Sequence, residues 1–139
     1  MKKTRMGEGN APIRKEDSMT PKEMALTIAK AVDSKKGKDI LVLETDGVTS
    51  LCDYFVLCSG SSAPQLKALG DAAEKAMKDN DIAPHHIEGH RGGTWILQDY
   101  GDVVVHLFSE EAREFYDLDR LWQDAKTVDL SEILAPENG

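Results

Sequence analysis

The sequence has few cysteines and no long apolar run. Only 2 of its 139 residues are cysteine, too few for a disulfide framework, so we expect a reducing compartment. No apolar run approaches the roughly 20 residues that cross a bilayer, and residues 1–10 lack the apolar core of a secretory signal. We therefore expect a cytoplasmic protein that neither spans nor binds a membrane.

Basic residues are outnumbered by acidic ones. Lys and Arg number 17 against 25 Asp and Glu, which gives a formal net charge of −8. A protein that binds a phosphate backbone needs a basic stripe, so we expect little direct nucleic-acid binding. An acidic surface instead favours a basic partner, and ribosomal proteins are an abundant basic class.

Residues 1–15 are the exception, because they carry five Lys or Arg against one Glu. We interpret residues 1–18 as a flexible, solvated N-terminal extension. The alternative is an arm that touches nucleic acid.

Two segments carry helix start signals. Residues 20–23 form a capping box with proline at the first helical position, and residues 62–65 repeat the box. The apolar spacing that follows each box predicts an amphipathic helix. A short helix is also predicted for residues 110–116, with a last helical turn at residues 118–122.

Five stretches of the sequence predict strands. The continuously apolar runs 39–44 and 54–58 are typical of strands buried on both faces. Residues 94–98 and 102–108 are rich in strand-forming residues and predict a hairpin around an Asp-Tyr-Gly turn. Residues 85–89 predict a short edge strand.

The order of these elements indicates one α/β domain. Two buried strands precede a helix and a hairpin follows it, which predicts a mixed β-sheet of about five strands flanked by helices. We place this domain at residues 19–126, between the extension at residues 1–18 and a loosely held acidic C-terminal tail at residues 127–139.

A serine-glycine turn at residues 59–62 separates a predicted strand from a helix N-terminus, where backbone N–H groups can hold an anion. Nucleotidyltransferases hold phosphate in such a turn and add strand carboxylates for magnesium. Asp99 and Asp102 flank a hairpin turn, where carboxylates are common for turn reasons alone. We interpret the serine turn as a capped helix start. The alternative is a nucleotidyltransferase-like enzyme that uses Ser61, Asp99 and Asp102.

The histidines and cysteines lack the spacing of known metal or nucleophile motifs. There is no paired Cys-x-x-Cys, no His-Glu-x-x-His and no Gly-x-Ser-x-Gly elbow. We therefore expect no metal, no cofactor and no catalytic residue. The side chains considered are Cys52, Cys58, His85, His86, His90 and His106.

The segment from Trp95 to Phe108 is largely apolar on both strand faces. If helices cover one face of the sheet, part of the other stays exposed. Phe115, Tyr116 and Trp122 follow among acidic residues, and aromatics in acidic surroundings suit a binding patch for a basic protein. From the residues alone, it is an equally good interpretation that Trp95 and Trp122 are ordinary core residues.

Three blocks resemble the Iojap family of ribosomal silencing factors. The first includes Asp53-Tyr54-Phe55-Val56 and the serine turn up to Gln65, the second runs from Gly93 to Phe108, and the third from Arg113 to Trp122. The resemblance covers residues 20 to 124, with the blocks in the family's order and spacing.

This resemblance implies a nucleotidyltransferase-like fold that is not known as an enzyme. It also implies binding to ribosomal protein L14 on the large ribosomal subunit, which blocks joining of the small subunit and represses translation. Organellar relatives assist large-subunit maturation. A homodimer formed through the same apolar face is a third hypothesis. The family's contact residues map onto Trp95, Leu97, Asp99 and Tyr100, with His106, Phe108 and Tyr116 nearby.

Overall fold

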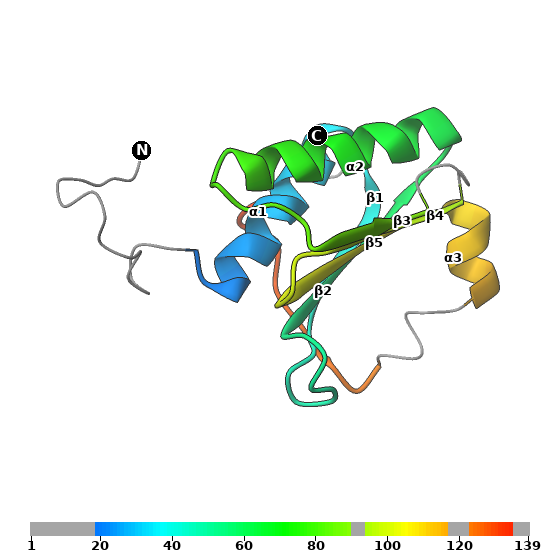
Figure 1. Ribbon diagram of the computed structural model, residues 1–139. Helices are drawn as coiled ribbons and strands as arrows, with labels where there is room; N and C mark the ends of the chain where they lie inside the picture. Colours follow the sequence, from blue (N-terminus) through cyan, green and yellow to red (C-terminus); the bar gives the residue numbers. More distant parts are fainter. Residues whose placement is uncertain (1–18, 90–93, 117–122, 135–139) are drawn as a thin grey trace, which may run out of the picture.

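A mixed sheet with strand order β3-β4-β5-β2-β1-β6 forms the centre of the molecule (Figure 1). The computed structural model describes residues 19–89, 94–116 and 123–134. β2 and β5 are parallel, and the other neighbouring strands are antiparallel. The strands are β1 Lys38–Glu44, β2 Tyr54–Gly60, β3 His86–Glu88, β4 Trp95–Asp99, β5 Val103–Ser109 and β6 Lys126–Thr127. The predicted mixed sheet is confirmed, with the short β6 added at its edge.

Helices flank this sheet, as predicted. Figure 1 shows α1 (Pro21–Ser34) and α2 (Ala63–Lys78) together on one side of the sheet. α3 (Glu110–Tyr116) lies apart from them and directly follows β5. No helix of the described residues is long and apolar enough to cross a membrane.

The serine turn forms the capped start of α2. Ser62 Oγ accepts a hydrogen bond from the backbone N–H of Gln65 at 3.1 Å. In a complete capping box, Gln65 Oε1 would also accept a hydrogen bond from the backbone N–H of Ser62. Here it accepts instead from the backbone N–H of Ser61 at 2.6 Å. Gln65 Nε2 donates to the carbonyl oxygens of Lys35 and Lys36 at 3.2 and 3.0 Å. The turn therefore connects the start of α2 to the end of α1.

The two faces of the sheet support separate apolar clusters. The larger cluster lies between the sheet and the helix pair α1 and α2, and it includes Ile28, Val32, Val56, Leu66, Leu69, Met77, Val105 and Leu107. The smaller cluster lies on the opposite face, where α3 contributes Ala112; it includes Leu43, Phe55, Leu57 and Phe108. Because apolar side chains are buried on both faces of the sheet, the sequences of its central strands are nearly continuous apolar runs.

Residues 126–134 differ from the loosely held tail expected from residue 127 onward. β6 pairs with Leu43 and Glu44 of β1, and the N–H of Val128 donates to the carbonyl of Val42 at 2.9 Å. Val128, Leu130, Ile133 and Leu134 are partly buried against the larger cluster. Apolar side chains spaced among the acids thus hold this segment on the sheet. The predicted turn at 118–122, the extension at 1–18 and residues 135–139 lie outside the described residues.

A buried polar chain joins α2 to the β4–β5 turn. Tyr100 Oη donates to Gln98 Oε1 at 2.8 Å, and Gln98 Nε2 donates to the carbonyl oxygen of Gly70 at 3.0 Å. Gln98 and Tyr100 are only 1% and 4% exposed. A side chain at position 70 would place its Cβ 3.2 Å from Gln98 Nε2, so glycine permits this close approach.

We predict that Tyr100→Phe lowers the free energy of unfolding by about 1–3 kcal/mol, because it leaves the buried amide oxygen of Gln98 without its donor. Chemical denaturation measures this loss. Tyr54→Phe is the matched control. Tyr54 Oη donates to Glu44 Oε2 at 3.3 Å, and the partly exposed Glu44 can be rehydrated, so we expect less than about 1 kcal/mol there. Equal losses in the two variants would contradict the importance of the buried chain.

Candidate docking surface

The register of β4 against β5 gathers alternate side chains on the sheet face turned away from α1 and α2. Residues directly opposite one another on paired strands point to the same face. The pairs on this face are Trp95 with Phe108, Leu97 with His106, and Asp99 with Val104. We call these six residues the docking face.

Burial varies across the docking face in a way that suits partner binding. Phe108 is fully buried and forms the floor, with its ring centroid 5.0 Å from that of Trp95. Trp95, Leu97 and Val104 are only partly buried. On the neighbouring strand β2, Leu57 is 1% exposed. The accessible part of this sheet face therefore lies over β4 and β5.

His106 lies at the centre of an aromatic group on this face. Its Nδ1 accepts a hydrogen bond from Trp95 Nε1 at 3.3 Å. Its ring stacks on that of Phe108, with centroids 5.9 Å apart and an interplanar angle of 4°, and it meets Phe55 edge-on at 4.9 Å. Burial lowers the pKa of His106 to about 4, so the imidazole is neutral near pH 7.

Strand β3 adds a polar rim that the sequence did not reveal. Glu88 pairs with Leu97, and His86 pairs with Asp99, so both side chains share the docking face. Both residues are exposed, and His86 Nε2 lies 2.6 Å from Glu88 Oε2. A three-residue strand is too short to show its register by alternation. Only the observed pairing assigns Glu88 to this surface.

Further carboxylates lie at the end of the docking face that Asp99 occupies. Burial raises the pKa of Asp53, and the nearby charges of Asp102 and Asp46 raise it further. The backbone N–H of Asp53 donates to the carbonyl of Asp102 at 2.8 Å, which fixes the two loops together. An apolar surface with negative charge along its edge suits a basic protein partner.

Five of the seven residues proposed as contacts lie together on the docking face. They are Trp95, Leu97, Asp99, His106 and Phe108. Tyr100 packs instead in the larger cluster on the opposite side of the sheet, 4% exposed. Tyr116 is the last residue of α3, and its side chain lies outside the described part of the chain.

The three residues of the enzyme alternative are not brought together. Ser61 directly follows the carboxyl end of β2, whereas Asp102 contacts the first residue of β2, Tyr54, through a backbone hydrogen bond of 3.1 Å. The length of β2 therefore separates the serine turn from Asp99 and Asp102. Within the described ranges, no group of three or more His, Cys, Asp or Glu could hold a metal ion.

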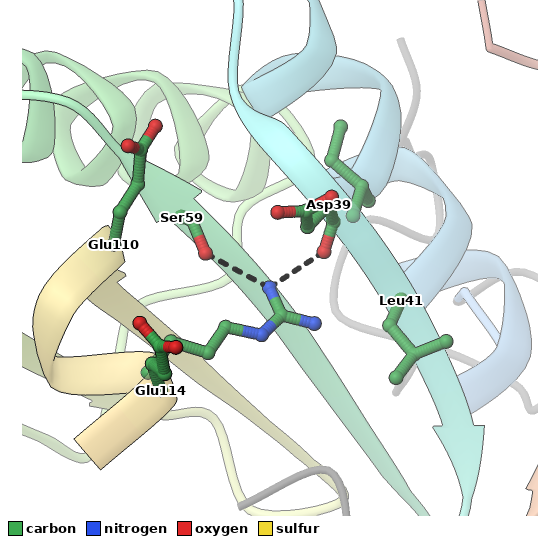
Figure 2. Close-up of a pocket in the computed structure, with 7 residues that line it drawn as sticks. Asp39, Leu41, Ser59, Glu110 and Glu114 are labelled. Atoms are coloured by element: carbon green, nitrogen blue, oxygen red, sulfur yellow. Dashed lines mark hydrogen bonds between the residues drawn. The ribbon is translucent and has the colours of Figure 1, made fainter. Parts of the chain in front are cut away.

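A pocket of about 570 Å³ lies beside α3, between its side chains and the strands β1 and β2 (Figure 2). Arg113 reaches across it and donates to the carbonyl oxygen of Asp39 at 2.6 Å and to Ser59 Oγ at 3.1 Å. Glu110 and Glu114 also line the pocket. Arg113 thus holds α3 against the sheet, and the surrounding carboxylates oppose a phosphate ligand.

Comparison with known proteins points to one family. The family model described as "Ribosomal silencing factor during starvation" matches residues 18–139. The chain is 34% identical over 117 residues to ribosomal silencing factor RsfS of Halalkalibacterium halodurans, covering 84% of this chain and 100% of that protein. It is 38% identical over 112 residues to RsfS of Bacillus subtilis, covering 81% and 95%. A crystal structure of a Chromobacterium violaceum protein superposes with a TM-score of 0.74 at 36% identity, covering 76% of this chain and 88% of that one.

We predict that calorimetric titration with ATP or CTP and magnesium gives no saturable heat, because the serine turn is used in capping and its acidic partners lie at the other end of β2. Asp99→Asn serves as the control for any signal. A magnesium-dependent isotherm that Asp99→Asn abolishes would restore the enzyme alternative.

Proposed function

The chain belongs to the RsfS family of ribosomal silencing factors, and from this we propose that it docks on ribosomal protein L14 of the large ribosomal subunit through its docking face. Membership supports a ribosome-associated role in silencing translation. The observation that supports this particular surface is the partly exposed Trp95 and Leu97 above the buried Phe108, on a sheet face that neither α1 nor α2 covers.

Steric exclusion is sufficient for the proposed effect. A factor bound to L14 occupies surface that the small subunit needs, so the two compete and the fraction of blocked subunits follows occupancy. No bond is made or broken in this scheme, and the protein acts as a regulatory binding factor in the cytoplasm. The net charge of −8 also disfavours direct attachment to ribosomal RNA.

The docking face has apolar side chains at its centre and charged side chains at its edge, as protein interfaces usually do. Partly buried aromatic and aliphatic side chains at the centre supply most of the affinity, which assigns that role to Trp95 and Leu97. Charged groups at the edge mainly accelerate encounter and select partners of opposite sign, which assigns that role to Asp99 and Glu88. The third hypothesis, a homodimer, would cover the same apolar face and would therefore compete with docking on L14.

We predict that Trp95→Ala weakens binding to large subunits by about 2 kcal/mol or more, as loss of a central aromatic anchor usually does. Co-sedimentation on a ribosome gradient measures the loss, and the wild-type protein should migrate with free large subunits rather than with joined ribosomes. Ile82→Ala is the matched control, because Ile82 is partly buried against the larger cluster, away from the docking face. Circular dichroism establishes that both variants fold. A folded Trp95→Ala that still co-sediments like wild type would refute this surface.

We predict that Glu88→Lys slows association with large subunits roughly tenfold at low ionic strength and much less at high salt. Surface plasmon resonance at two salt concentrations measures this. Asp71→Lys makes the same change in net charge on α2, where Asp71 pairs with Lys67 at 3.1 Å, and should leave the rate nearly unchanged. If both charge reversals slowed association equally, the rate would depend on net charge alone, which would contradict the role of Glu88 at the edge of the docking face.

A further inference from the structure

The hydrogen bond between Trp95 and His106 determines which imidazole nitrogen carries the proton. An indole N–H is only a donor, so His106 Nδ1, 3.3 Å away, must accept. Because burial lowers the pKa of His106 to about 4, the ring is neutral near pH 7 and carries a single N–H. That hydrogen must therefore lie on Nε2.

Nε2 lies in an environment that does not favour a donor. The atom is buried, and no described residue forms a hydrogen bond with it. The rings of Phe55 and Phe108 pack against the imidazole. Leaving a buried donor without a partner lowers stability, so an apolar side chain of similar size would suit the fold of this position at least as well. The acceptor at Nδ1 is what histidine adds.

We propose that His106 is a positioning residue, which acts through Trp95 by holding the indole ring in the orientation that docks on the partner. Two contacts then hold the indole in place. Nδ1 of His106 accepts a hydrogen bond from the indole N–H, and the ring of Phe108 packs against the indole ring. A pre-oriented aromatic anchor loses less conformational freedom on binding than a mobile one. This inference rests on the proposed docking function, and it assigns to His106 an effect on affinity that is exerted through Trp95.

Two substitutions separate positioning from a purely structural role. His106→Leu removes the acceptor and also removes the unsatisfied donor. His106→Asn keeps an acceptor, because its Oδ1 is the same number of bonds from Cα as Nδ1 of histidine. We measure the ¹H–¹⁵N resonance of the Trp95 indole, identified by its absence in Trp95→Phe, together with affinity for large subunits and the temperature of unfolding.

For His106→Leu we expect the indole proton to shift upfield, affinity to fall roughly tenfold, and the unfolding temperature to stay the same or rise. His106→Asn should recover the indole shift in part and bind within about threefold of wild type. This combination, weaker binding without lower stability and with rescue by Asn, is not expected of a residue that only fills the core.

Other outcomes overturn the inference. It fails if His106→Leu binds like wild type, if the indole resonance does not move, if Asn gives no rescue, or if His106→Leu unfolds at a clearly lower temperature. Trp95→Ala distinguishes these failures from a failure of the proposed function. If Trp95→Ala binds like wild type, both proposals fall. If Trp95→Ala loses binding while His106→Leu does not, only the positioning role falls.

Discussion

The sheet has two apolar faces, and the described helices cover them unequally. α1 and α2 pack across one face and bury it, while α3 contributes Ala112 to the other face beside Phe108 and Leu57. Apolar surface left on the β4–β5 half of that second face is unfavourable in water. Exposed apolar surface of this kind often marks a binding site, and the position of α3 leaves the β4–β5 half as the part that we propose for docking.

The physical roles within the docking face follow from this unequal covering. Phe108 is buried by its own fold and provides a rigid floor, so Trp95 is held against it without contact from a partner. Acidic side chains lie at the margins, where water keeps them solvated and their charge still extends toward a basic partner. The serine turn, the feature that most resembles a phosphate site, instead stabilises the junction of α1 and α2 through Gln65.

Much of the fold could be predicted from the sequence, because capping boxes and apolar runs are local signals. The bounds of α1 and α2 and the hairpin of β4 and β5 follow from such signals. Residues 126–134 could not be placed, since their attachment depends on pairing with β1 rather than on local pattern. In the site, alternation predicts that Trp95 and Leu97 share a face. It cannot show that Tyr100 turns into the core to reach Gln98, or that Glu88 lies opposite Leu97.

We propose that the bound protein and the small subunit exclude one another on the large subunit. Light scattering of purified subunits, mixed after the large subunits have been incubated with increasing amounts of this protein, measures their joining directly. We expect the amplitude of joining to fall in proportion to occupancy and to recover when excess small subunits displace the protein. Joined ribosomes that form at full amplitude while still carrying the protein would contradict it.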